Sequence, residues 1–348
     1  MRARTLLHRG FTIVELLVVL AVIAILTGLI LAGLRSAVAT ANKTKEGSML
    51  KGYHAAWQSY TNTFDALLPG YLDETTQQTW NVSYKNRNGT VLDRALTQTY
   101  TWRIAPYFEG NMSSLIGYRN VETEDPENDV ALDWSPQPAL PTWMQGAWTM
   151  PGSAVALQPA FGYNAYYLGG WYTTNGGVSV PEYLDAPWTT ATGSAVTGRI
   201  VAQTEAQISK PSEMTVFSSS TYRSANLTGY KAGAAGEDNA LGSAWIVPSY
   251  LGSTQVWSIG SGTPQGIVLT QRSASEQFAS MLAPSASAAQ DSSTLVVYVD
   301  QSVPLRRYNR QAAVVHADGS VGSAGANQLL NMEQWVSQAW KPDFRHGP

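Results

Sequence analysis

An uncharged apolar segment near the N-terminus, residues 16–34, constrains this chain more than any other feature of its sequence. Only Thr27 and two glycines interrupt the apolar run. At ~1.5 Å of rise per residue, a helix of this length measures about 28 Å, close to the ~30 Å hydrocarbon core of a bilayer. The sequence therefore predicts that the chain meets a membrane at this segment.

Two interpretations of the segment compete. A secretory signal peptide is supported by Ala37-Val38-Ala39 and Ala39-Thr40-Ala41, which both fit a small-x-small cleavage pattern. Against it, the run is longer than the roughly 7–15 residues of a signal-peptide core, and Glu15 stands at its leading edge. A carboxylate near hydrocarbon costs roughly 2.5–3.5 kcal/mol, so Glu15 is a candidate functional residue. Basic residues stand on both sides of the segment, and charge bias does not set its orientation.

The residues that enter the segment carry a specific pattern: Arg9-Gly10-Phe11-Thr12-Ile13-Val14-Glu15, followed by the long apolar run. This pattern resembles the processing and methylation site of type IV pilins and type II secretion pseudopilins. The resemblance implies that a prepilin peptidase cuts between Gly10 and Phe11 and methylates the new amine of Phe11. It also implies a single pass through the inner membrane, with the leader, residues 1–10, in the cytoplasm and the head in the periplasm. After assembly, the filament would lie at the cell envelope or surface.

In this family, the carboxylate equivalent to Glu15 is thought to pair with the N-terminal amine of a neighbouring subunit. An unpaired carboxylate is costly in an apolar bundle, so Glu15 favours the subunit register that supplies a cation. The alternative is that Glu15 only interacts with the dipole at its helix N-terminus. The implied partners are prepilin peptidase, identical or related pilin subunits, the pilus or secretion assembly platform and the membrane.

Beyond residue 34 the helical pattern continues, because no proline occurs before Pro69 and apolar residues recur at spacings of three or four. We expect one helix from about Ile13 to about Asn62, with an amphipathic second half packed on a globular domain. The remainder predicts short strands, clearest at residues 100–104, 215–219, 266–270, 294–299 and 312–316. The fold class is therefore α+β and pilin-like, with a leader (1–10), a transmembrane and filament-core helix (11–62) and a β-rich head (63–348).

Turns and loops punctuate the head. Asn88-Gly89, Asn175-Gly176 and Asp318-Gly319 predict tight turns, and the last predicts a hairpin with the strand at 312–316. Stretches rich in Gly, Ser and Ala at 189–198, 232–242 and 285–293 predict long surface loops.

The Asp318-Gly319 pair also belongs to a second resemblance. Arg307-Tyr308, nine residues and Asp318-Gly319-Ser320-Val321 look like the C-terminal His-x9-Asp-Gly motif of a pilin-like subfamily. Because Tyr308 replaces the histidine, no site is carried over from this motif.

Composition excludes several chemistries. The chain has no cysteine, which removes thiol nucleophiles, Cys-zinc sites and disulfides. A net charge of −3 supplies no basic field for nucleic acid. Of four histidines, His8 is lost with the leader, and His54, His316 and His346 show no spacing typical of a metal site or catalytic triad. We therefore expect no enzyme activity.

One ion site is conceivable from sequence. An acidic run with hard oxygen ligands surrounds Glu124, Asp125, Glu127 and Asp129, and some pseudopilins use Ca²⁺ to hold a loop. The run lacks an EF-hand pattern, and a solvated acidic loop is the alternative. No other cofactor is implied.

The middle of the chain is dense in aromatic residues, which predicts core packing, with sugar stacking or a protein contact as the alternative. These residues are Trp134, Trp143, Trp148, Trp171 and Trp188, with Tyr163, Tyr166, Tyr167 and Tyr172.

The sequence thus favours a structural subunit of a type IV pilus-like or type II secretion pseudopilus filament. The first alternative is a minor or tip subunit that binds a surface, a glycan or secretion cargo. The second is an enzyme tethered to the cell surface.

Overall fold

The computed structural model describes residues 13–108, 115, 147, 149–175, 178–181, 184–220, 244–246, 248–255, 257–259, 267–269 and 311–347. Within these ranges some side chains, including those of residues 30–33, are outside the description. The chain divides into two compact units, Met1–Glu46 and Gly47–Pro348. We refer to the second unit as the head.

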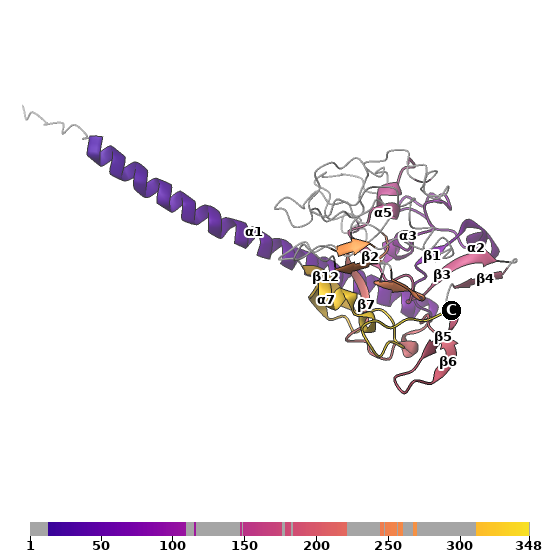
Figure 1. The fold of residues 1–348 in the computed structure, drawn as a ribbon. Coiled ribbons are helices and arrows are strands. Elements are labelled where there is room, and N and C mark those ends of the chain that lie inside the picture. Colours follow the sequence, from indigo (N-terminus) through magenta and orange to yellow (C-terminus); the bar gives the residue numbers. More distant parts are fainter. Residues whose placement is uncertain are drawn as a thin grey trace, which may run out of the picture. The chain divides into compact units, whose positions relative to one another are not determined.

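A single long helix, α1, runs from Ile13 to Phe64 (Figure 1). The prediction of one helix from Ile13 to about Asn62 is confirmed, with an end two residues later. No proline interrupts the helix, and Asp65 then adopts a left-handed backbone conformation (φ 52°), which stops helix propagation. Pro69 follows shortly after, at a position where the helix has already ended.

The main sheet of the head has the strand order β13-β12-β7-β2, and all its neighbours are antiparallel. Its strands are β2 (Phe161–Tyr163), β7 (Thr215–Ser219), β12 (Gln311–His316) and β13 (Val321–Gly325). The strands predicted at 215–219 and 312–316 are therefore confirmed. All five residues of β7 are buried, which fits its β-branched and aromatic composition.

The other strands form smaller sheets. A three-stranded sheet has the order β1-β3-β4, in which β1 and β3 are parallel. The remaining strands pair as antiparallel hairpins: β5 with β6, β8 with β9 and β10 with β11. Their bounds are β1 Tyr71–Leu72, β3 Trp171–Asn175, β4 Val178–Pro181, β5 Asp185–Thr189, β6 Ala195–Arg199, β8 Tyr250–Leu251, β9 Thr254–Gln255, β10 Trp257–Ile259 and β11 Ile267–Leu269.

Three of these strands, β5, β6 and β11, test predictions made from the sequence. The strand predicted at 266–270 is found as β11, whereas the one predicted at 294–299 lies outside the described residues. The predicted loop at 189–198 is wrong, because most of it belongs to the hairpin of β5 and β6. The many small residues of this segment indicated a loop. In the structure, only residues 190–194, which form the turn around Gly193 (φ 83°), lie outside the two strands.

The helices of the head are short: α2 Glu74–Thr79, α3 Thr101–Ile104, η1 Ala105–Phe108, α5 Ser153–Leu157, η3 Glu205–Gln207, α7 Ala326–Leu330 and η5 Met332–Gln334. The strand predicted at 100–104 is wrong, because α3 occupies it. All four residues of α3 are buried. The segment therefore lacks the alternation of buried and exposed positions by which a helix and a strand are told apart in a sequence. The guanidinium of Arg103 donates to the carbonyl oxygens of Pro69, Thr97 and Gln98, and these bonds favour the helical position.

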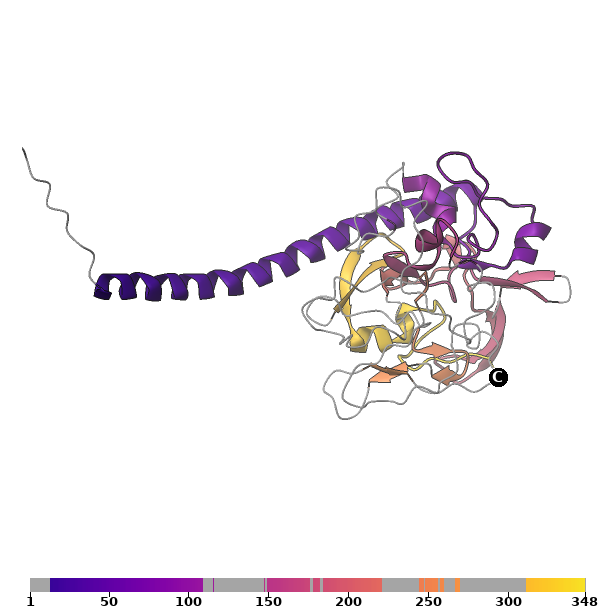
Figure 2. The ribbon, with the colours of Figure 1, turned by 90° about the horizontal axis from the view of Figure 1, so that it is seen from above.

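The core of the head forms where the last part of α1 lies along the main sheet (Figures 1 and 2). Leu50, Tyr53, Trp57 and Tyr60 are spaced by three and four and are all buried. The ring of Tyr53 stands edge-on to Phe161 of β2 at 5.0 Å and to Phe217 of β7 at 5.4 Å. The indole nitrogen of Trp57 donates to the hydroxyl of Tyr163 over 3.3 Å. The predicted amphipathic second half of the helix is therefore confirmed.

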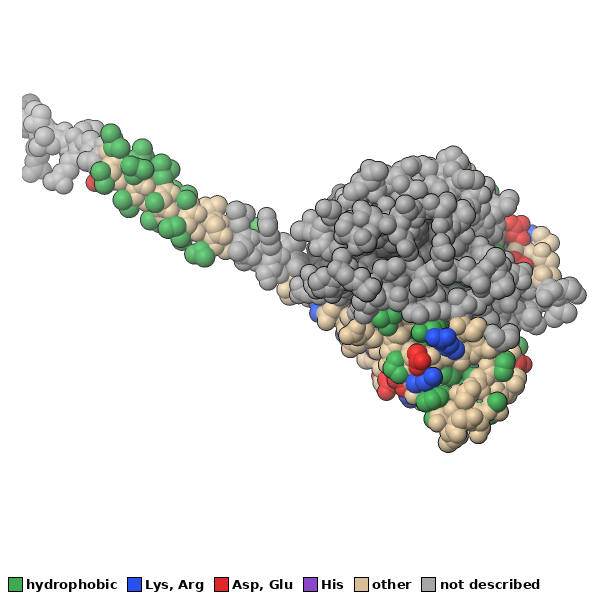
Figure 3. All heavy atoms as spheres, in the orientation of Figure 1, with side chains coloured by type: hydrophobic (Ala, Val, Ile, Leu, Met, Phe, Trp, Pro, Cys, Tyr) green, Lys and Arg blue, Asp and Glu red, His purple; other side chains and the backbone are tan. Residues whose placement is uncertain are grey.

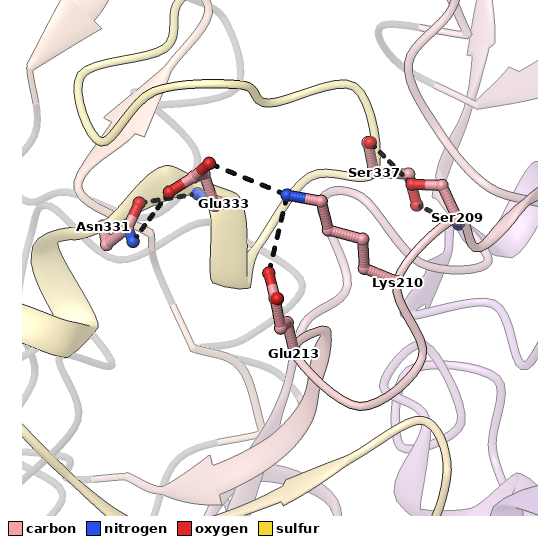
Figure 4. A network of polar contacts seen from close by, with 6 residues as sticks. All are labelled: Ser209, Lys210, Glu213, Asn331, Glu333 and Ser337. Carbon is pink, nitrogen blue, oxygen red and sulfur yellow. Dashed lines mark hydrogen bonds and ion pairs between the residues drawn. The ribbon is translucent and has the colours of Figure 1, made fainter.

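Polar contacts fasten the C-terminal segment to the loop before β7 (Figure 4). The ammonium of Lys210 lies 3.5 Å from a carboxylate oxygen of Glu213 and 3.6 Å from one of Glu333. The hydroxyl of Ser209 donates to the carbonyl oxygen of Ser337 over 2.8 Å. These groups are largely solvent-exposed, so they position the segment rather than add much stability.

Candidate functional site

The first part of α1 is apolar on every side. Five consecutive residues, 16–20, are Leu or Val, and steps of 100° place them around the whole helix circumference. The large apolar side chains from Ile13 to Leu29 are 47% to 78% exposed, and they show as a green surface in Figure 3. Such a helix differs from an ordinary surface helix, which has one polar face. Its exposed apolar area indicates a surface that is covered in the working state.

Glu15 is the only charged residue between Ile13 and Leu29. It lies in the first turn of α1 and is exposed. A carboxylate at this end of a helix interacts favourably with the partial positive charge of the helix N-terminus. The predicted processing residues, Gly10 and Phe11, lie outside the described residues. Among the residues whose side chains are described, no helix is long and apolar enough to cross a membrane.

The ion site and the histidine sites considered from sequence can be checked only in the described part of the head. Within the described ranges, no group of three or more His, Asp or Glu side chains could hold a metal ion. The residues of the proposed calcium loop, Glu124, Asp125, Glu127 and Asp129, lie outside those ranges.

The three histidines of the head occupy separate settings. His54 is buried on α1, and its Nε2 lies 3.0 Å from the carbonyl oxygen of Ala317. His316 ends β12, and burial lowers its pKa. His346 is buried in the C-terminal segment, where burial lowers its pKa to about 4 and its Nε2 lies 3.1 Å from the hydroxyl of Tyr167.

The aromatic-dense middle of the chain is core where it is described. Trp171, Tyr163, Tyr166, Tyr167 and Tyr172 are all at most 9% exposed, which confirms the packing interpretation for these residues. Trp188 is half-buried against the same core. The other three tryptophans, Trp134, Trp143 and Trp148, lie outside the described residues.

The predicted hairpin at Asp318-Gly319 is confirmed as the turn between β12 and β13. The carboxylate of Asp318 accepts hydrogen bonds from the backbone N–H and the hydroxyl of Ser320, and these bonds lower its pKa. Gly319 has φ 83° and lies against the ring of His54 on α1. Sequence reasoning predicted the turn but not this contact, because nothing local in the sequence connects residues 54 and 319.

The comparisons with known proteins assign the N-terminal segment. Residues 7–31 match the family described as the prokaryotic N-terminal methylation motif. No curated protein and no solved structure gave a match. The matched range contains Gly10, Phe11, Glu15 and most of the exposed apolar helix. Residues 7–31 thus carry the N-terminal methylation signature that is found in type IV pilins and pseudopilins.

Proposed function

We propose that this protein is a structural subunit of a type IV pilus-like or type II secretion pseudopilus filament. The observation that carries the proposal is the helix that follows the methylation motif, which is apolar on every side, exposed, and charged only at Glu15. Covering the large side chains from Ile13 to Leu29 with apolar neighbours is worth on the order of 10 kcal/mol. A bundle of such helices provides that cover in a filament, and a bilayer provides it before assembly.

Processing prepares the helix for this role. Prepilin peptidase cuts between Gly10 and Phe11 on the cytoplasmic side of the inner membrane and methylates the amine of Phe11. Removal of Arg2, Arg4 and Arg9 with the leader changes the net charge from −3 to −6. The head then lies in the periplasm and, after assembly by the platform, at the cell envelope or surface.

Glu15 selects the subunit register. It becomes the fifth residue of the mature chain, about one helical turn from the new amine. An apolar bundle makes an unpaired carboxylate costly, so the arrangement that places a neighbour's amine at Glu15 is favoured.

The test is filament formation by Glu15→Val in cells that supply prepilin peptidase and an assembly platform. We expect the variant to be cleaved and to stay membrane-bound, but to form no filaments in electron micrographs. Glu205→Val, which removes an exposed carboxylate of the head, is the matched control and should assemble normally. Normal filaments from Glu15→Val would contradict the assembly role.

A second candidate is a minor or tip subunit that binds an external ligand. The size of the head, Gly47–Pro348, favours it, because a filament core needs only the helix. Immunogold labelling at filament tips alone would support this candidate, whereas labelling along whole filaments would support a major subunit.

A further inference from the structure

Three turn dipeptides of this sequence share one reactivity: Asn88-Gly89, Asn175-Gly176 and Asp318-Gly319. The backbone nitrogen of a glycine is unhindered, because glycine has no side chain, so it can attack the side-chain carbonyl carbon of the residue before it. Whether this attack takes place depends on how freely the turn moves and on whether that carbon is a good electrophile. The structure separates the three dipeptides on these two points.

Asn88 lies at the tip of a short hairpin, residues 84–92, which we call the Asn88 hairpin. The N–H of Gly89 donates to the carbonyl oxygen of Asn86 over 3.0 Å, which closes the turn. Residues 87–91 are all exposed. Gly89 has φ 80°, and no atom lies within 4 Å of a Cβ added to it. The dipeptide is therefore open to water, with free space around it.

Little pairing holds the Asn88 hairpin closed. Its two arms meet in one isolated bridge, between Lys85 and Val91, rather than in a ladder of strand pairs. Short exposed segments with few hydrogen bonds open locally at a small cost in free energy. Opening releases the N–H of Gly89 from Asn86 and lets this nitrogen turn toward the side chain of Asn88.

The other two dipeptides are held more firmly. Asn175 ends β3 within a ladder of four residue pairs with β4. The carboxylate of Asp318 accepts hydrogen bonds from the hydroxyl and the backbone N–H of Ser320 over 2.6 and 2.9 Å, and these bonds lower its pKa. Asp318 therefore stays ionised, and an ionised carboxylate is a poor electrophile. Gly319 also lies against the ring of His54, which restricts the movement of this turn.

We propose that Asn88 is a site of spontaneous deamidation, a covalent change that needs only water. The backbone nitrogen of Gly89 bonds to Cγ of Asn88 and gives up its proton, and the side-chain amide leaves as ammonia, which closes a cyclic imide. Water then opens the imide at either carbonyl, so the products are aspartate and β-linked isoaspartate. The sum is one water consumed and one ammonia released, with no change of oxidation state. The head gains a negative charge at the hairpin tip, so an aged chain differs chemically from a newly made one.

A glycan is the alternative modification of the same residue. Asn88-Gly89-Thr90 fits the Asn-x-Ser/Thr pattern that accepts N-linked oligosaccharides. That reaction requires a transferase and a lipid-linked sugar donor, whereas deamidation requires only the hairpin and water. The masses of the two products differ widely, so one measurement tells them apart.

The experiment incubates the detergent-solubilised full chain in mildly alkaline and in mildly acidic buffer and follows its proteolytic peptides by mass spectrometry. We expect the peptide with Asn88 to gain the mass of the change from amide to acid, and to do so faster in alkaline buffer, because the nitrogen of Gly89 attacks after it loses its proton. In the same chain, Asn175 should convert about tenfold more slowly or less, because its ladder must open first. A sample digested without incubation gives the background.

Two variants identify the residue. Asn88→Gln should abolish the added negative charge in ion-exchange chromatography, because its longer side chain closes a ring far more slowly. Asn88→Asp carries the product charge from the start and should elute with the aged chain. Circular dichroism melting curves check that both variants are folded, and a synthetic peptide of residues 84–92 shows that the buffer supports the reaction.

Three outcomes would overturn the proposal: an unchanged Asn88 in the full chain when the synthetic peptide converts, conversion of Asn175 as fast as that of Asn88, or the same added charge in Asn88→Gln. A glycan on Asn88 in the chain as purified would also overturn it, because the linked amide no longer leaves as ammonia. Since the reaction is followed on unassembled chains, its result is independent of filament assembly and of the proposed function.

Discussion

Gly319→Ala offers a sharp test of how the turn between β12 and β13 packs against the last part of α1, within the head. Gly319 turns the chain between β12 and β13 with φ 83°, a conformation that costs a residue with a side chain roughly 1–2 kcal/mol. A Cβ added there would lie 3.0 Å from Cε1 and 3.2 Å from Nδ1 of His54. Both distances are shorter than ordinary van der Waals contact, so either the ring or the turn must move.

His54 has little freedom to move. Its side chain is 8% exposed, and its Nε2 is held 3.0 Å from the carbonyl oxygen of Ala317. Overpacking of this kind adds about 1 kcal/mol or more. We therefore expect Gly319→Ala to lower the free energy of unfolding by about 2–3 kcal/mol.

Gly193→Ala is the matched control, because Gly193 has the same φ of 83° and no atom within 4 Å of an added Cβ. It should cost only the backbone contribution, roughly 1–2 kcal/mol. Urea unfolding of the full chain in detergent, followed by tryptophan fluorescence, gives these values.

A double-mutant cycle with His54→Ala isolates the contact. In the His54→Ala background, the cost of Gly319→Ala should fall to that of Gly193→Ala. If Gly319→Ala costs the same as Gly193→Ala in both backgrounds, the turn does not press on α1 and the reasoning is refuted.

Three further predictions address the core, the C-terminal segment and the acidic loop. Tyr53→Ala should lower the free energy of unfolding by about 3–5 kcal/mol in urea titrations, because it empties a fully buried site between α1 and the main sheet; a loss below about 1 kcal/mol would contradict the described packing. Because burial lowers the pKa of His346 to about 4, the unfolded chain binds its proton more tightly, so stability should fall by up to about 3 kcal/mol as the pH drops from about 6.5 to 4. His346→Phe should flatten this pH dependence of the unfolding midpoint, and an unchanged slope would rule out His346 as its source. If the acidic loop binds Ca²⁺, millimolar Ca²⁺ should raise the melting temperature of the chain, and the double variant Asp125→Asn, Asp129→Asn should abolish this shift. An unchanged melting temperature of the unaltered chain would contradict Ca²⁺ binding and favour a loop that is only solvated.

The parts of the fold that sequence predicts well are those with a clear period or a strong turn signal. Apolar spacing of three and four predicted α1 and its buried stripe, including Tyr53 and Trp57. β-branched runs next to Asp318-Gly319 predicted the last hairpin. In both cases local preference and tertiary packing favour the same structure.

The errors occur where tertiary contacts override local preference. Residues 100–104 have strand-like composition, but burial on all sides and the carbonyl oxygens around Arg103 favour the helix α3. Residues 189–198 have loop-like composition, but β5 and β6 pair across them. In the candidate site, the motif around Glu15 was readable from sequence because it is local. The contact between His54 and the Gly319 turn was not, since its hydrogen-bonded residues are 263 positions apart.

The role as a filament subunit depends most directly on where the chain is cut. The measurement is the intact mass and N-terminal sequence of the chain purified from cells that contain prepilin peptidase. We predict an N-terminus at Phe11 that carries one methyl group, with the apolar helix and Glu15 retained. Cleavage after Ala39 or Ala41, the sites of the signal-peptide alternative, would remove that helix and contradict the assignment as a filament subunit.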